Sequence, residues 1–164
     1  MLLPSFSVLL RQSIVNHTKE PGSLSMSRDL FTTGGCRCGA VKISVLDKPQ
    51  MMVQCHCLDC KKFSGTGHTS NAYFAESDVI IEGALHDYTV IADSGAEMKR
   101  SFCPTCGSRL SGTNSARPDL VSITVGCLDH SSWYTPQMVL YSSRKHDWDI
   151  TSDEIVQFDQ MPSN

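Results

Sequence analysis

Cysteine spacing is the feature that most limits what this chain can fold into. Seven of its eight cysteines lie in three clusters, a central trio and a flanking pair on either side. The clusters are Cys36/Cys38, Cys55/Cys57/Cys60 and Cys103/Cys106. Bunched thiols with CxxC spacing favour shared metal ions over a framework of disulfides. We therefore expect metal-bound cysteines and a reducing compartment.

Length and charge exclude several other classes of protein. The chain has 164 residues, which suits one domain of ordinary size. Its net charge of −3 gives no bulk attraction to nucleic acid or to an anionic membrane. No apolar run approaches the roughly 20 residues that a membrane-spanning helix needs. We expect neither a nucleic-acid partner nor a membrane anchor.

The N-terminal stretch differs in composition from the rest. Its first 19 residues hold Arg11, His17 and Lys19 and no acidic residue. Residues 1–30 therefore read as a flexible leader, with a mitochondrial presequence as the alternative. We expect a zinc-binding domain over residues 31–155 and a loose C-terminal tail over 156–164. The expected location is the cytoplasm, or the mitochondrion if the leader is a presequence.

Short strands are predicted throughout the domain. The segment 40–46 alternates apolar and polar residues, as a half-buried strand does. Segments 79–81 and 88–91 look like a pair joined by a turn around Gly83. Further strands are predicted over 51–55, 68–75, 109–111, 120–125 and 138–141, and segment 97–102 leads into the last cysteine pair. Because no segment shows a long helical period, we predict an all-β domain of mainly antiparallel sheets, with few or no long helices.

The two outer pairs predict one closed metal site. In Cys103-Pro104-Thr105-Cys106, proline fixes φ at the start of the tight turn that brings both thiolates to one ion. Cys36 and Cys38 are spaced to share a face and can supply the other two ligands. Four thiolates around zinc form a structural site. Its negative charge would be offset by nearby arginines, for which the candidates are Arg37, Arg100 and Arg109.

The central trio predicts a second, open site. Three thiolates on one Zn²⁺, from Cys55, Cys57 and Cys60, leave a fourth position for water or a substrate thiol, as catalytic zinc sites do. Lys61 and Lys62 follow directly and are candidates for binding a substrate carboxylate; ordinary surface lysines are the alternative.

Two further residues near these motifs are not expected to bind metal. His56 should point away from its cysteine neighbours, so we expect a surface residue rather than a fourth ligand. Cys127 is expected in a buried strand as a small core residue.

The order of the motifs resembles a known family. The match runs through Gly34-Gly35-Cys36-x-Cys38-Gly39, Cys55-His56-Cys57-x-x-Cys60-Lys61-Lys62, Phe102-Cys103-x-x-Cys106-Gly107-Ser108, Gly126-x-Leu128-Asp129 and a late Trp148. The chain is similar to the glutathione-dependent formaldehyde-activating enzyme family, which includes the centromere protein V group. The resemblance covers roughly residues 31 to 150. Members usually carry a second acid after Leu-Asp, where this chain has His130.

The resemblance implies a β-tent fold with two zinc ions. It implies a structural zinc on the outer pairs and a catalytic zinc on the trio. The implied activity is that of a carbon–sulfur lyase, with glutathione as co-substrate and a small-molecule thiol adduct of an aldehyde as substrate. S-hydroxymethylglutathione synthase is the founding example. The alternative is a non-catalytic glutathione- or zinc-binding module, or a protein-interaction module of the centromere protein V type.

Overall fold

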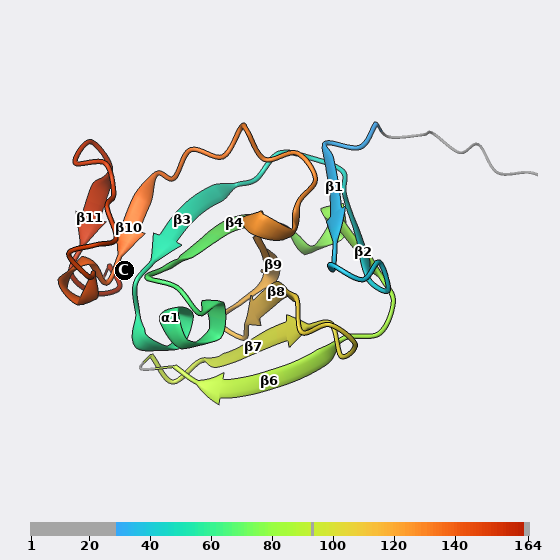
Figure 1. Ribbon diagram of the computed structural model, residues 1–164, viewed down its shortest axis with the longest axis horizontal. Helices are drawn as coiled ribbons and strands as arrows, with labels where there is room; N and C mark the ends of the chain where they lie inside the picture. Colours follow the sequence, from blue (N-terminus) through green and yellow to red (C-terminus); the bar gives the residue numbers. More distant parts are fainter. Residues whose placement is uncertain (1–28, 93, 163–164) are drawn as a thin grey trace, which may run out of the picture.

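The computed structural model describes residues 29–92 and 94–162. The expected leader, 1–30, therefore lies almost entirely outside the described residues. Within the described part, strands form a three-stranded sheet and an eight-stranded sheet (Figure 1). The predicted all-β class is confirmed.

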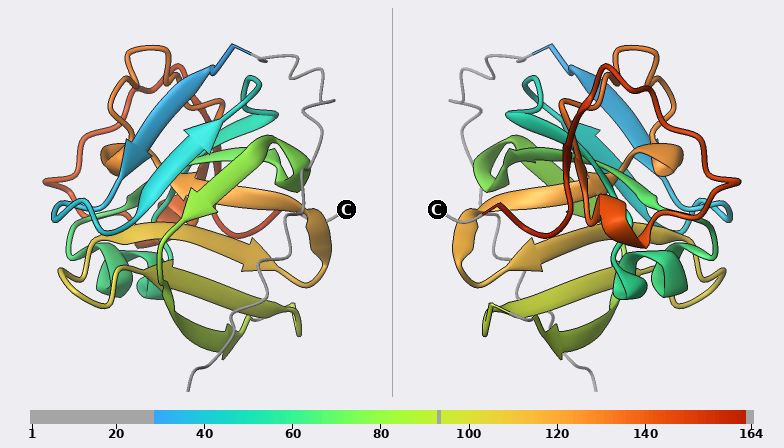
Figure 2. Two further views of the ribbon diagram at one scale, coloured as in Figure 1. Left: turned by 90° about the vertical axis from the view of Figure 1, so that its right-hand side faces the viewer. Right: turned by 90° about the vertical axis from the view of Figure 1, so that its left-hand side faces the viewer.

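The small sheet holds the start of the domain. Its strand order is β1-β2-β5, and both pairings are antiparallel. Figure 2 shows these strands side by side, and in Figure 1 they lie at the opposite end from β10 and β11. The strands are β1 (Thr32–Gly35), β2 (Lys42–Val45) and β5 (Val79–Glu82).

The large sheet has the order β11-β10-β3-β4-β9-β8-β7-β6. Neighbouring strands run antiparallel except β10, which pairs parallel with both β3 and β11, so this sheet is mixed. The expected C-terminal tail, 156–164, contributes the edge strand β11. The strands are β3 (Met51–Cys55), β4 (Thr69–Ala75), β6 (His86–Ile91), β7 (Glu97–Phe102), β8 (Arg109–Asn114), β9 (Arg117–Thr124), β10 (Met138–Leu140) and β11 (Val156–Phe158).

The predicted pairing of 79–81 with 88–91 is wrong. Both segments are strands, but β5 pairs with β2 in the small sheet and β6 pairs with β7 in the large one. Gly83, with φ +108°, lies between them at a point where a Cβ would sit 2.2 Å from the carbonyl oxygen of Ala40. Only glycine tolerates that approach and that backbone angle. The turn therefore carries the chain from one sheet to the other instead of closing a hairpin.

Alternation along the strands divides the large sheet into two faces. Ala72, Phe74 and Ile123 face the small sheet and pack with Ile43 and Val45 in the main core. The intervening residues face the other way. There a second cluster joins Cys55 and Cys60 to Val53 and Leu140.

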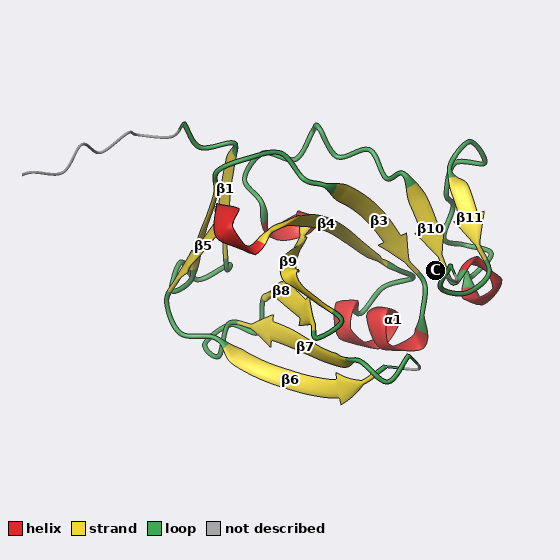
Figure 3. Cartoon of the chain, turned by 180° about the vertical axis from the view of Figure 1, so that it is seen from behind, coloured by secondary structure: helices red, strands yellow, loops and turns green. Residues whose placement is uncertain are grey.

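One α-helix, α1 (Leu58–Ser64), occurs in the described residues. It lies between the β3/β4 pair and β7 in Figures 1 and 3, and its Phe63 contacts Phe102 of β7 edge to face. Seven residues are too few to show a helical period in the sequence. The 3₁₀ turns are η1 (Glu76–Asp78), η2 (Val125–Cys127) and η3 (Ser142–Arg144). None of the described helices has the length and apolar character required to cross a bilayer.

Candidate metal centres

The outer cysteine pairs meet at the edge of the main core. We call Cys36, Cys38, Cys103 and Cys106 the quartet; their four sulfur atoms all lie within 4.8 Å of one another. The first pair sits in the turn after β1, and the second in the turn between β7 and β8. Cys36 and Cys103 are buried while Cys38 and Cys106 face outward. The quartet thus joins two segments that are distant in the sequence.

Distances in the quartet suit a tetrahedral ion. The Sγ atoms of Cys36 and Cys38 are 3.4 Å apart, and those of Cys38 and Cys103 are 3.8 Å apart. Both separations far exceed a disulfide bond of about 2.05 Å. Sulfurs at about 2.3 Å from a tetrahedral zinc would lie about 3.8 Å from each other. The donor set therefore fits zinc.

Neighbouring hydrogen bonds favour the thiolates of Cys106 and Cys36, whereas at Cys38 a hydrogen bond from the Ala40 backbone is outweighed by competition with these two cysteines, so its pKa rises to about 11. The side chain of Ser108, then its backbone N–H, lowers the pKa of Cys106 to about 5. The backbone N–H of Val41 donates to the Cys36 sulfur at 3.2 Å. Ser108 also accepts a hydrogen bond from the Arg37 backbone at 3.0 Å, which ties the two turns together. Metal ligands must be deprotonated, so these donors prepare the site for a cation.

The central cysteines form a second group, the trio of Cys55, Cys57 and Cys60, at the end of β3 and the start of α1. Cys57 is the N-cap of α1, and its sulfur accepts a hydrogen bond from the Cys60 backbone N–H at 3.3 Å. Cys55 and Cys60 are buried, whereas Cys57 is partly exposed. The strand-to-helix junction therefore turns three nearby thiols toward one point.

The trio needs a cation to ionise fully. Competition with Cys57 and then Cys60 raises the pKa of Cys55 strongly, while hydrogen bonds from Cys55 and Cys57 lower that of Cys60 to about 2. One thiolate is thus stabilised at the expense of its neighbours. A soft divalent cation would offset all three charges. No fourth His, Cys, Asp or Glu ligand atom belongs to this group in the described chain.

Two arginines expected beside the quartet flank the helix of the trio instead. The guanidinium carbons of Arg109 and Arg100 lie 4.8 Å and 6.0 Å from the ring centre of Phe63 in α1. Arg109 also donates to Thr69 at 3.0 Å, and its positive charge helps lower the pKa of Cys60. Arg100 pairs with Asp59 at 3.4 Å. Of the three arginines, Arg37 lies in the turn of the quartet.

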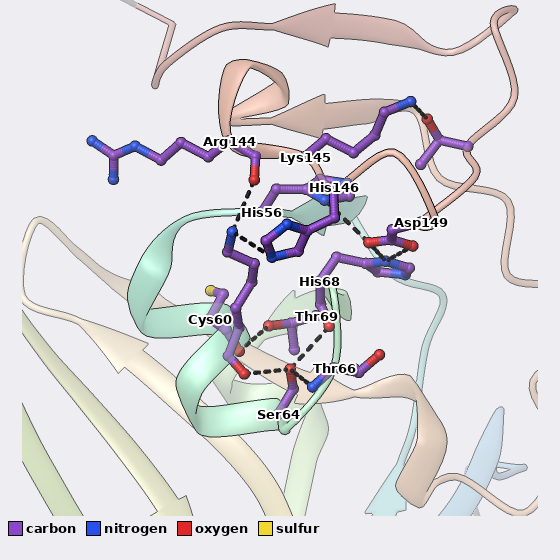
Figure 4. A network of polar contacts seen from close by, with 12 residues as sticks. His56, Cys60, Ser64, Thr66, His68, Thr69, Arg144, Lys145, His146 and Asp149 are labelled. Atoms are coloured by element: carbon purple, nitrogen blue, oxygen red, sulfur yellow. Dashed lines mark hydrogen bonds and ion pairs between the residues drawn. The ribbon is translucent and has the colours of Figure 1, made fainter.

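The two lysines after the trio have different surroundings. The Lys61 ammonium donates to the carbonyl of Arg144 at 2.9 Å and lies 3.1 Å from Nε2 of His146 (Figure 4). Lys61 therefore ties α1 to the C-terminal segment. Lys62 is exposed. Of the pair, Lys62 is the one left accessible for a ligand.

The interpretation of His56 as a surface residue is wrong. Its side chain does point away from the trio, but it is 0% exposed. The segment after η3 covers it and brings Asp149 within 3.3 Å of Nδ1 (Figure 4). Alternation along the chain predicts the direction of a side chain and says nothing of what covers that side.

His56, His68 and Asp149 form a third cluster that the sequence analysis missed. Nδ1 of His68 lies 2.9 Å and 3.0 Å from the two carboxylate oxygens of Asp149. A Cβ on Gly67 would come 2.1 Å from one of those oxygens, so any other residue there would have to displace the Asp149 side chain. Burial lowers the pKa of His56, which favours the neutral imidazole. These three ligand atoms are also close enough to share an ion. In the sequence, Thr66-Gly67-His68 is only a weak indication of this cluster, because Asp149 is far along the chain.

Cys127 belongs to no metal-ligand group of the described residues. It lies in the 3₁₀ turn η2 rather than in a strand, because the turn ends β9 at Thr124. Its thiol donates to the carbonyl of Thr124 at 2.9 Å, and burial raises its pKa to about 12. The side chain packs against the main core, as predicted.

His130 contributes through its backbone. Its carbonyl accepts hydrogen bonds from the Thr32 hydroxyl at 3.0 Å and from the Trp133 indole at 2.9 Å. The preceding Asp129 accepts from the Thr33 hydroxyl at 2.7 Å. This turn therefore fastens β1, which leads into the quartet.

Known proteins resemble this chain in sequence and in fold. The profile of the family described as glutathione-dependent formaldehyde-activating enzyme matches residues 31–144. The crystal structure of a Rhodobacter sphaeroides protein is similar to this chain, with 27% sequence identity and a TM-score of 0.50. That similarity covers 61% of this chain and 90% of the Rhodobacter protein. The family match includes all seven clustered cysteines.

Proposed function

Since the chain belongs to the glutathione-dependent formaldehyde-activating enzyme family, we propose that it is a zinc-dependent carbon–sulfur lyase. Its substrate would be an adduct between glutathione, or a similar thiol, and an aldehyde. The observation that carries the proposal is the trio, which presents three converging thiols and no fourth protein ligand among the described residues. Such a site leaves room for a substrate thiol.

The two cysteine groups would have different roles. The quartet would hold a structural zinc, and the trio a catalytic zinc. When bound to the trio, zinc would supply Lewis acidity that favours the ionised form of the substrate sulfur. Arg109 would add a positive charge beside the trio. Its charge already helps lower the pKa of Cys60.

The reaction reversibly breaks and forms the carbon–sulfur bond of the adduct. In the breakdown direction the carbon–sulfur bond of the adduct breaks and its electron pair stays on sulfur. The hydroxyl on the same carbon loses its proton and becomes the carbonyl of the aldehyde. That proton ends on the departing sulfur or in solvent. Synthesis reverses each change, and no oxidant or reductant is involved.

Binding of the peptide part of glutathione would use the basic end of α1. Lys62 is exposed beside the trio and can approach a carboxylate of the ligand. Lys61 is held by the C-terminal segment and would act mainly by its charge. For the location we propose a reducing compartment such as the cytoplasm, because all eight cysteines are free thiols.

Replacing Cys57 tests the proposal, with Cys127→Ala as the matched control. Exchange between free and glutathione-bound formaldehyde can be followed by NMR, which separates catalysis from the fast spontaneous reaction. We expect Cys57→Ser to lower the catalysed rate by about 10²-fold or more, by analogy with losing one stabilising group for developing charge. Cys127→Ala should leave it near the wild-type value.

Two results would contradict this function. One is a Cys57→Ser variant that retains the wild-type rate while its zinc content falls. The other is glutathione binding to the wild-type protein without any acceleration of exchange, which would indicate a binding module instead of an enzyme.

A further inference from the structure

A cavity of about 180 Å³ lies on the face of the large sheet that carries the trio. Strands β3, β4 and β7 to β10 line it, and the C-terminal residues Met161 and Pro162 complete its wall. Four methionines are among the residues that line it. They are Met51, Met98, Met138 and Met161.

The inner wall of the cavity is shared with the trio. Leu140 lines the cavity, pairs across β10 and β3 with Cys55, and packs in one cluster with Cys55 and Cys60. Tyr73 lines the cavity as well and packs against the same cluster. The cysteines of the trio do not line the cavity themselves, so a group bound there would approach Cys55 across Leu140 and Tyr73.

The chemistry of the walls selects an apolar occupant. Methionine side chains are flexible and polarisable, so they adapt to rings and branched chains. The charged residue among the described lining is Arg117, which is exposed. A tripeptide with two carboxylates is poorly matched to such a space. A hydroxymethyl group would leave most of it unfilled, whereas an apolar cavity of about 150 Å³ already accommodates benzene.

We infer that this cavity binds an apolar, ring-sized substituent on the carbon that bonds to the substrate sulfur. The substrates would then be thiol adducts of aromatic or branched aldehydes in preference to the formaldehyde adduct, which would still be turned over. This inference rests on the proposed function in taking the trio as the place where the carbon–sulfur bond forms and breaks.

Tyr73 is suitably placed to contact the oxygen on that carbon. Its phenolic hydroxyl can donate a hydrogen bond.

Equilibrium binding of two inert thioethers to the zinc-loaded full-length protein tests the inference. S-benzylglutathione and S-methylglutathione differ only in the substituent, and neither can be cleaved by the proposed reaction. Calorimetry should show the benzyl compound binding at least about tenfold more tightly, because its ring leaves water for an apolar cavity. Equal affinities would overturn the inference.

A cavity-filling variant locates the effect. Met98→Trp should bring the ratio of the two affinities close to one by occupying the space. The matched control is Ile91→Trp, which adds the same side chain at a position of β6 that is 68% exposed and should keep the wild-type ratio. If Met98→Trp fails to fold, Leu120→Phe makes a smaller filling change in the same cavity. A filled variant that retains the wild-type ratio would exclude this cavity as the binding site.

Failure of this inference can be distinguished from failure of the proposed function. A preference for the benzyl ligand in a protein that turns over no adduct would support the cavity and contradict the lyase reaction. Turnover of the formaldehyde adduct together with equal affinities for the two thioethers would support the lyase reaction and contradict the role of the cavity.

Discussion

The quartet and the trio use the same ligand type in opposite ways. The quartet joins turns that are 65 residues apart at Cys38 and Cys103, and it borders the main core. The trio takes all its ligands from the short stretch where β3 becomes α1. A metal in the quartet would close a long loop and hold the fold, whereas a metal in the trio closes almost none. The difference suggests that one group supports structure while the other is free to serve chemistry.

The largest expected effect comes from breaking the quartet. Cys103→Ser removes a fully buried ligand. Structural zinc contributes on the order of 10 kcal/mol to folding in small zinc domains, which is comparable with the whole stability of a domain. We expect this variant to lose its cooperative thermal transition, followed by circular dichroism, while Cys57→Ser keeps one. A Cys103→Ser protein that melts like the wild type would remove the contrast between the two groups.

The next effect concerns how the trio is supported. Gly67→Ala would push a methyl group into the carboxylate of Asp149, which covers His56. We expect a loss of about 2 kcal/mol in the free energy of unfolding, typical of overpacking, together with weaker metal retention at the trio alone.

Gly126→Ala is the matched control, because no atom lies within 4 Å of the added carbon. Denaturant melts and metal content measure both properties. Equal stability of the two variants would show that Asp149 moves aside without cost.

Chelation should separate the two groups by rate. The trio offers three candidate ligands and a partly exposed sulfur at Cys57, whereas the quartet offers four candidate ligands. With EDTA we expect one equivalent of zinc to leave at least about tenfold faster than the other, a modest difference in barrier. A zinc-responsive dye records the release. In Cys57→Ser only the slow phase should remain; loss of the slow phase instead would assign the labile metal to the quartet.

The smallest effect is expected at Cys127, the cysteine outside both groups. Cys127→Ala should cost about 1 kcal/mol of stability, as other small truncations in a core do, and should leave the zinc content unchanged. Burial raises the pKa of this thiol to about 12. Its thiolate is therefore scarce at pH 8 and becomes more abundant as the pH rises toward 12.

In the native wild-type protein, iodoacetamide labelling of Cys127 should accordingly be slow at pH 8 and faster at higher pH. Mass spectrometry of the labelled peptides measures this. Rapid labelling at pH 8 would contradict a buried thiol.

Much of the fold followed from local pattern. Strand β3 begins and ends where it was predicted, because the turn at residues 47–49 precedes it and the trio follows it. The hairpin expected between β5 and β6 failed for a different reason. The backbone of Gly83 approaches Ala40 from another part of the chain, and a sequence window around the turn does not contain that contact.

Short spacings brought the cysteines of each outer pair and of the trio together locally, and the four ligands of a closed zinc site predicted that the two outer pairs combine into one quartet. Long-range packing determined the surroundings of the two cysteine groups. It buried His56 under Asp149, moved Arg109 to the trio, and joined distant strands and the C-terminal end around the cavity. Such contacts depend on which surfaces cover one another after the sheets assemble, and no local spacing encodes that.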